Sequence, residues 1–176
     1  KKALLADEDV CLVAHSMGGL ICRVLLESGN FDGRAWFGRI TMLITLATPH
    51  EGAPLALVRI LGLEGAASLS AGDTRRVASD PRYPSAYQLL PGPGEQSVWD
   101  LRTQGTELVD ISSDGVAELG LNPDLLARAE ALHQTLDLSK RPDHVRYFAF
   151  VATGHDTVTR VNLVATGSGP GRTEGD

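Results

Sequence analysis

Three apolar runs mark the predicted strands of this chain. They cover residues 10–15 (VCLVAH), 40–47 (ITMLITLA) and 145–152 (VRYFAFVA). The second run is rich in β-branched residues and has no strict alternation, which is typical of a strand covered on both faces in a parallel sheet. A helical pattern separates the first two runs, so they form a βαβ unit with a right-handed crossover. The pattern therefore predicts an α/β fold with helices packed on parallel strands.

Two longer helices are expected. The first covers residues 17–28, where one apolar stripe is made of Leu20, Ile21, Val24 and Leu25. The second begins at Asn122-Pro123-Asp124, because Asn caps well, Pro suits the first helical position and an acid suits the first turn. It continues to about residue 138, with a buried stripe of Leu125, Leu126, Ala129, Leu132 and Leu136.

The middle of the chain is less regular. Residues 55–63 form a short helix in our interpretation, and residues 64–93 an irregular cap or lid, because Gly, Ser, Pro and Ala dominate there. The whole insertion of residues 55–140 lies between the second and third strands. Residues 99–111 are ambiguous, and the tail after Asn162 turns to Gly, Ser, Pro and Arg, which indicates loop.

Composition narrows the class of protein. The 176 residues suit one domain, and 43% hydrophobic with 22% charged residues is ordinary for a globular protein. A net charge of -6 without a basic run argues against a nucleic-acid partner. No apolar run approaches the ~20 residues of a membrane span, and no signal peptide is visible. Trp36 and Phe37 are expected to anchor the loop before the second strand.

The two cysteines give no metal or disulfide pattern. Cys11 falls in the first strand and Cys22 on the following helix, so both are predicted to be buried free thiols. Free thiols favour the cytoplasm, although the compartment stays open. No His, Cys or carboxylate cluster has metal-ligand spacing, and no cofactor is implied.

The strongest chemical signal is the sequence Ala14-His15-Ser16-Met17-Gly18 between the first strand and its helix. It matches the G-x-S-x-G nucleophile elbow with Ala14 in the first Gly position. The tight turn demands that Ala14 and Gly18 be small, and the helix N-terminus favours a developing oxyanion. The backbone N–H of Met17 is one expected oxyanion donor. The alternative is a Gly-rich turn that only packs or binds phosphate.

Further candidate residues lie at the same edge of the predicted sheet. Thr48, Pro49 and His50 follow the second strand directly, and the carboxyl ends of parallel strands are where sites form. They are therefore expected beside Ser16, as residues that shape the substrate site. Asp156 follows the third strand and is a candidate acid, or else a turn residue bonded to its own backbone.

No histidine is a convincing base. His15 adjoins the nucleophile but points away from it, so we expect packing rather than catalysis. His155 follows the third strand and could reach Ser16. His133 and His144 are expected to be surface or packing residues.

Three segments together resemble the lecithin:cholesterol acyltransferase-like lipases of the α/β-hydrolase superfamily. They are AHSMGG, TLATPHEGAP and YPSAYQLLP. The family pattern has GHSMGG, a TPHxG-type segment and a PS-x-x-LLP segment. A strand with a Thr-containing turn follows, and then GDGTVP with the catalytic Asp. Here Ala-Thr-Gly-His-Asp-Thr occupies the turn, and Glu174-Gly175-Asp176 stands where GDGTVP would begin.

The resemblance implies an α/β-hydrolase fold and acyl transfer through a Ser16 acyl-enzyme. Asp176 becomes the expected acid, with Asp156 as the alternative. The resemblance also implies an internal fragment, whose oxyanion loop precedes residue 1 and whose catalytic His follows residue 176. Substrates would be carboxylic esters, plausibly lipids, with contact to a lipid surface through the cap. His15, Thr48, Pro49 and His50 are the implied substrate-site residues.

Two other hypotheses remain open. An elbow does not encode the leaving group, so a serine hydrolase for thioester or peptide bonds fits the same residues. A non-catalytic, hydrolase-like binding module fits as well. The oligomeric state, and the choice between hydrolysis and acyl transfer, are not determined by the sequence.

Overall fold

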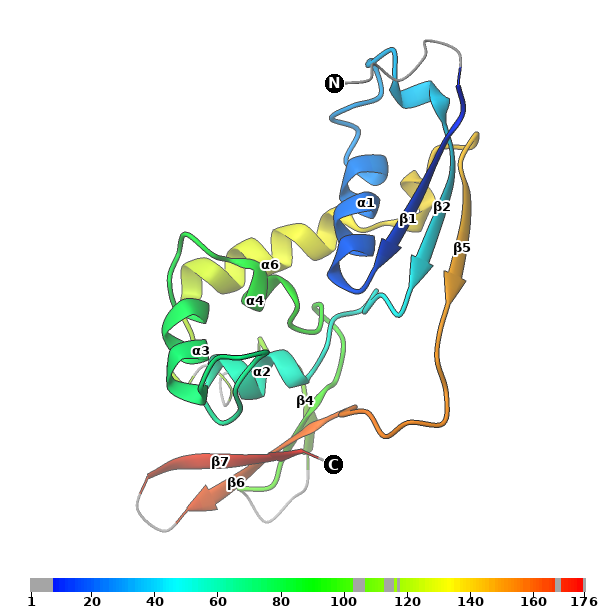
Figure 1. The fold of residues 1–176 in the computed structure, drawn as a ribbon. Coiled ribbons are helices and arrows are strands. Elements are labelled where there is room, and N and C mark those ends of the chain that lie inside the picture. Colours follow the sequence, from blue (N-terminus) through cyan, green and yellow to red (C-terminus); the bar gives the residue numbers. More distant parts are fainter. Residues whose placement is uncertain (1–7, 103–106, 113–115, 117, 167–168, 176) are drawn as a thin grey trace. The chain divides into compact units, whose positions relative to one another are not determined.

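The computed structural model describes residues 8–102, 107–112, 116, 118–166 and 169–175. They divide into two compact units (Figure 1). The first unit contains residues up to 50 together with residues 134–155, and the second contains residues 51–133 together with residues 156–176. Each unit has its own sheet and its own apolar core.

The first unit is built on a three-stranded parallel sheet. Its strands are β1 (Val10–His15), β2 (Ile40–Leu46) and β5 (Arg146–Phe150), in the order β1-β2-β5. Val13 pairs with Ile44, and Ile44 pairs with Phe148. The three predicted strands and their parallel arrangement are confirmed, although β2 and β5 are shorter than expected.

Helix α1 (Met17–Glu27) joins β1 to the 3-10 turn η1 (Phe37–Arg39) and β2, and it packs on the sheet (Figure 1). The predicted helix is thereby confirmed. The core beneath it consists of Leu26, Phe37, Ile40, Leu43 and Val145. Phe37 anchors the preceding loop as expected. Trp36 is 42% exposed, and its ring lies against that of Phe37 with the ring centroids 6.1 Å apart.

Helix α1 covers one face of the sheet, and on the other face Val13 of β1 and Phe148 of β5 are 64% and 44% exposed, whereas Ile44 of β2, which lies between them, is half-buried. Coverage of β2 on both faces stays a prediction. Cys11 is exposed, so the expected burial of this thiol is wrong. Alternate residues of a strand point to opposite faces, and α1 covers one of them. Cys22, on α1, is half-buried, and this burial raises the pKa of its thiol.

The second unit contains more regular structure than its composition indicated. Its described helices are α2 (Leu55–Ile60), α3 (Ala71–Ala78), α4 (Ser85–Gln88) and most of α6 (Pro123–Thr135). The 3-10 turn η2 (Leu138–Lys140), which follows α6 in the chain, belongs to the first unit. The irregular cap expected over residues 64–93 therefore includes two helices. Ser70 begins α3 by accepting a hydrogen bond from the Asp73 N–H, a local cap that the Gly-rich context obscured.

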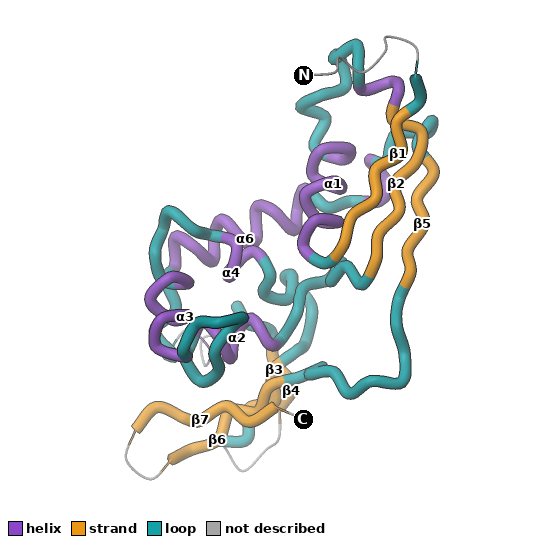
Figure 2. Tube along the Cα trace, viewed as in Figure 1, coloured by secondary structure: helices purple, strands orange, loops and turns teal. Residues whose placement is uncertain are grey.

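A four-stranded mixed sheet completes the second unit. Its strands are β3 (Val98–Asp100), β4 (Glu107–Val109), β6 (Val161–Thr166) and β7 (Gly169–Gly175), in the order β4-β3-β6-β7. The loop-like tail expected after Asn162 is thus an antiparallel pair of strands. Buried Val161 and Leu163 hold β6 against the core, and β7 joins through backbone pairing. Figure 2 shows the long loop between β5 and β6.

The core of the second unit gathers residues from each of its described helices and from the strands β3 and β6. It includes Leu57, Tyr87, Leu90, Val98, Leu125 and Val161. The predicted start of α6 is confirmed, because the Asn122 side-chain oxygen accepts the Asp124 N–H at 2.9 Å and the Leu125 N–H at 3.3 Å. Leu125 and Ala129 form its buried stripe, whereas Leu136 lies beyond the end of the helix.

Among the described helices, none has the length and apolarity needed to cross a membrane.

Candidate active site

Ser16 occupies a strained turn between β1 and α1, which we call the elbow turn (residues 16–19). Its backbone has φ 53° and ψ −133°, a conformation that L-residues rarely adopt. The Ser16 N–H donates to the Leu46 carbonyl at 2.9 Å, and the Gly19 N–H donates to the Ser16 carbonyl at 3.1 Å. The strand, the tight turn and the helix expected for a nucleophile elbow are therefore all present.

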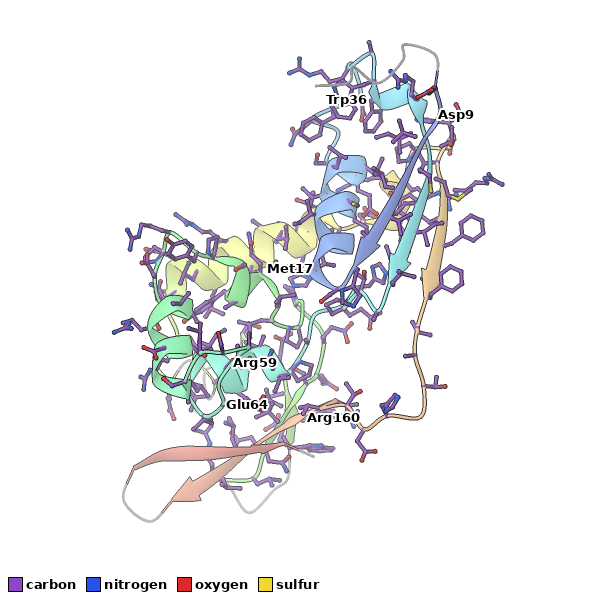
Figure 3. The ribbon with its side chains drawn as sticks, in the orientation of Figure 1. Asp9, Met17, Trp36, Arg59, Glu64 and Arg160 are labelled. Carbon is purple, nitrogen blue, oxygen red and sulfur yellow. The ribbon has the colours of Figure 1, made fainter. Side chains whose placement is uncertain are left out.

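The Ser16 hydroxyl makes no hydrogen bond to any described residue. Ser16 is the N-cap of α1, yet in the described part of the chain its hydroxyl makes no capping hydrogen bond. The residue is half-buried, so its hydroxyl is neither enclosed nor exposed on all sides. Helix α1 begins at Met17, which is labelled in Figure 3. The backbone N–H groups of the first helical turn have no intrahelical partner. This end of α1 can stabilise negative charge near Ser16.

The two glycines after Met17 differ in what their surroundings require. A Cβ on Gly18 would lie 3.7 Å from the Ala14 Cβ, which is ordinary contact. A Cβ on Gly19 would lie 2.6 Å from the Thr48 Cγ2 and 2.8 Å from the Thr48 Cβ, and it would also overlap Oγ1. The sequence pattern assigned the steric demand to Gly18, but the structure assigns it to Gly19.

A second strained turn follows β2, and we call it the TPH turn (residues 47–50). Ala47 has φ 47°, and its N–H donates to the Phe150 carbonyl at 2.9 Å. The His50 N–H donates back to the Thr48 carbonyl at 3.0 Å. The Thr48 hydroxyl is enclosed and has no hydrogen-bond partner among the described residues. Thr48 therefore lies beside the elbow turn as expected, against Gly19.

Both ring nitrogens of His50 are engaged. Nε2 lies 3.1 Å from the Thr45 Oγ1, and Nδ1 lies 3.5 Å from the Arg23 Nη1. The ring thus connects the TPH turn to β2 and to α1, all within the first unit. A histidine with both nitrogens committed to the protein is a poor base and a poor ligand.

The sequence reasoning missed a buried ion pair on α1. Arg23 and Glu27 are 5% and 2% exposed, and they form two parallel hydrogen bonds of 2.8 Å. A signal was present, because both residues occupy positions of the buried helical stripe that contains Leu20 and Leu26. Charged residues at such positions need buried partners.

Tyr147 of β5 lies in the same polar region. Its hydroxyl is buried, and that burial, reinforced by the negative charge of Glu27, raises the pKa of Tyr147 well above its usual range. The phenol is therefore neutral at physiological pH, as burial beside a carboxylate requires.

Two of the sequence motifs meet in the second unit. The Ala53 N–H donates to the Leu89 carbonyl at 2.7 Å, and the Gly92 N–H donates to the Glu51 carbonyl at 3.2 Å. Gly52 has φ 93°, and a Cβ there would lie 2.6 Å from the Leu90 carbonyl carbon. The TPHEGAP and YPSAYQLLP segments are thus joined by backbone contacts that tolerate only glycine at residue 52.

The remaining candidate residues lie elsewhere on their units. His15 is exposed, so the expected packing role is not supported. His155 and Asp156 are exposed in the loop after β5. His133 packs in the second unit, where its Nε2 lies 2.8 Å from the Leu90 carbonyl oxygen. His144 is exposed and lies edge-on to Phe37.

Two further predictions concern the catalytic acid and metal binding. Asp176, the expected catalytic acid, lies outside the described residues. Within the described ranges, no group of three or more His, Cys, Asp or Glu side chains is arranged to bind a metal ion.

Comparisons with known proteins agree with this architecture. A family model described as the PGAP1-like alpha/beta domain matches residues 2–62, the segment that contains β1, α1, β2 and both turns. No curated protein matches the sequence. The matching model is not that of the lecithin:cholesterol acyltransferase-like lipases, so that narrower resemblance remains a prediction.

A solved structure extends the agreement to most of the chain. One chain of "The crystal structure of Tle4-Tli4 complex" aligns with a TM-score of 0.58 and 16% sequence identity. The alignment covers 90% of this chain and 39% of that chain, so this sequence spans well under half of its structural neighbour. The family model, the structural neighbour and the helix-packed parallel sheet together show that the chain has an α/β-hydrolase fold.

Proposed function

We propose that this chain carries the nucleophile of a serine hydrolase or acyltransferase that acts on carboxylic esters, with Ser16 as the nucleophile. The observation that carries the proposal is the elbow turn. A serine at φ 53°, at the N-terminus of α1, has a hydroxyl that no described residue binds. A strained backbone lowers the stability of the fold, and such strain is found most often at functional sites. A catalytic role for Ser16 therefore explains why the strain is retained.

In the proposed reaction the Ser16 Oγ attacks the ester carbonyl carbon while a histidine takes the hydroxyl proton. The bond between the carbonyl carbon and the leaving alkoxide oxygen then breaks, and the alcohol departs with that proton. Water or a second alcohol attacks the acyl-enzyme, gives up a proton through the same base, and releases a carboxylic acid or a new ester. The Met17 N–H would donate to the oxyanion in both tetrahedral intermediates.

The base and the acid complete the proposal. Of the described histidines, His155 is the candidate base, because both nitrogens of His50 are already engaged. We assign the acid to Asp176 on the resemblance of Glu174-Gly175-Asp176 to the family motif, with Asp156 as the alternative. His15 and Pro49 are proposed to contact substrate at the rim of the site.

Lipid esters are the proposed substrates. In the second unit several large apolar side chains are exposed, and exposed apolar side chains can contact lipid. They are Leu63, Leu69, Val77 and Tyr83, which are 44% to 53% exposed. The proposed lid role of this unit rests on those residues together with the resemblance to lipases.

A labelling experiment tests the nucleophile. The intact protein is treated with a fluorophosphonate probe, and the modified residue is located by mass spectrometry. We expect label on Ser16, and none after Ser16→Ala. The control is Ser28→Ala at the other end of α1, which should be labelled like the wild type. Label on another residue would overturn the assignment, and no label in the wild type would favour a binding module.

A substrate panel then separates the reaction classes. Short-chain and long-chain p-nitrophenyl esters, a thioester and a peptide are compared by kcat/KM. The proposal expects the highest value for a long-chain ester. A preference for the thioester or the peptide would keep Ser16 as nucleophile but replace the substrate class.

A further inference from the structure

The buried side chains behind the elbow turn form a directional hydrogen-bond chain. Arg23 donates from Nε and Nη2 to the two carboxylate oxygens of Glu27, both at 2.8 Å. This bidentate pair leaves Nη1 free to face the His50 Nδ1 at 3.5 Å. A guanidinium has donors and no acceptor, so the His50 Nδ1 must be the acceptor.

The direction of that bond fixes the state of the histidine. With Nδ1 unprotonated, the ring is neutral and carries its proton on Nε2, which donates to the Thr45 Oγ1 at 3.1 Å. The Thr45 hydroxyl in turn donates to the Phe148 carbonyl of β5 at 3.5 Å. One chain of donors thus runs from α1 through the TPH turn to β2 and β5.

We propose that His50 is a positioning residue for the Ser16 nucleophile: its neutral Nε2–H ring, held by Arg23, fastens the TPH turn and so holds Thr48 against Gly19. The proposal rests on the proposed function of Ser16. His50 touches neither nucleophile nor substrate in it, and it acts through the backbone of its own turn.

The packing of Thr48 makes this connection sensitive. Thr48 fits where a side chain on Gly19 would lie, and Gly19 follows the predicted oxyanion donor Met17 by two residues. A displacement of the TPH turn would open space beside the first turn of α1. Catalytic geometry tolerates little of this, because a 1 Å misplacement can cost about 100-fold in rate.

The buried ion pair suits this role better than a role in stability. Replacing such a pair with apolar side chains is often neutral or stabilising, so its stabilising contribution alone does not account for it. Its geometry, by contrast, is specific. The planar Arg23 fork binds Glu27 on one side and presents a single N–H to His50 on another.

The test measures the rate of Ser16 labelling in the intact protein. Wild type, Ser16→Ala, His50→Ala, His50→Gln and the control His144→Ala are compared with a fluorophosphonate probe. Gln places an amide donor near the position of the His50 Nε2, so it can restore the bond to Thr45. His144 lies at the opposite end of the parallel sheet, before β5.

We expect His50→Ala to lower the second-order labelling rate by roughly 10- to 100-fold, with KM for an ester substrate little changed. His50→Gln should recover most of that rate, and His144→Ala should match the wild type. Long-range ¹H–¹⁵N spectra of the wild type should report a His50 ring protonated on Nε2 alone.

The outcomes separate this proposal from the one on which it rests. Wild-type protein without label on Ser16 would overturn both. Wild-type rates in both folded His50 variants would overturn the positioning role and leave Ser16 as nucleophile. If His50→Ala does not fold, the comparison of His50→Gln with wild type and the ring tautomer decide. A ring protonated on Nδ1 contradicts the proposal whatever the rates.

Discussion

The elbow turn and the TPH turn have similar backbone conformations, but their polar side chains have different environments. Each follows a parallel strand, and each has a residue with positive φ whose N–H bonds to the last residue of the neighbouring strand. These residues are Ser16, bonded to Leu46, and Ala47, bonded to Phe150, both at 2.9 Å. At the elbow turn the polar side chain stays unbonded and half-buried. At the TPH turn the Thr48 hydroxyl is enclosed and His50 is bonded on both sides.

The difference indicates that one turn presents the proposed nucleophile and the neighbouring turn holds it in place. A nucleophile needs a side chain that the fold has not already bonded, and the fold must then hold the turn by other means. Here the means are the TPH turn and the ion pair beneath it. Residue type alone does not separate the two roles, because serine and threonine carry the same hydroxyl.

The largest effect is expected from removing the two hydroxyls separately. Ser16→Ala should lower kcat by roughly 10⁴- to 10⁶-fold, because the covalent step is lost. Thr48→Val keeps the shape of the side chain and removes a hydroxyl that no described residue binds, so it should change kcat by less than about tenfold. Steady-state kinetics on the intact protein make the comparison. Similar losses in both variants would mean that the two turns are functionally alike.

Breaking the ion pair beneath the turns should have the next largest effect. Arg23→Met leaves Glu27 buried without a partner and should cost about 3–5 kcal/mol in the free energy of unfolding. Urea denaturation, followed by Trp36 fluorescence in a Trp99→Phe background, reports on the first unit.

Two further variants sharpen that measurement. The double variant Arg23→Met/Glu27→Leu should recover most of the loss, because no unpaired charge remains. Lys140→Met removes the exposed pair with Asp137, in the same unit, and should cost less than about 1 kcal/mol. Equal losses in Arg23→Met and Lys140→Met would contradict the buried role of Arg23.

The two elbow glycines offer a smaller but cleaner contrast. Gly19→Ala forces a Cβ onto Thr48 and should destabilise the first unit by about 1–3 kcal/mol. Gly18→Ala meets only ordinary contact, and alanine favours a helix by up to about 1 kcal/mol over glycine. It should therefore be neutral or stabilising. Thermal unfolding of the two variants suffices, and the opposite ranking would mean that Thr48 does not pack there.

The smallest effect concerns alkaline pH. Because the pKa of Tyr147 is raised in the folded protein, the unfolded chain ionises first. Stability from this residue is therefore complete below its ordinary pKa of 10.0, and it is lost as the pH rises above that value. Tyr147→Phe should lose less stability between about pH 9 and pH 11 than wild type. Tyr83→Phe, at an exposed tyrosine, should behave like wild type.

The sequence by itself determined the features that depend on neighbours along the chain. The apolar runs located β1, β2 and β5, the stripe from Leu20 to Leu25 located α1, and Asn122 located the start of α6. The order of strand, small residue, serine and glycine located the elbow turn. Each signal is local, because it reflects the period of one element or the chemistry of one turn.

Only the tertiary structure decided the rest. The Gly-rich tail forms β6 and β7 because β3, some sixty residues earlier in the chain, offers a parallel partner to Val161. Cys11 and Val13 are exposed, although the apolar run that contains them predicts burial. Glycine is sterically required at residue 19 rather than at residue 18, because Thr48, from the turn after β2, packs against Gly19. The roles of Arg23 and His50 also depend on partners distant in sequence, and pairings of that kind have no local period to reveal them.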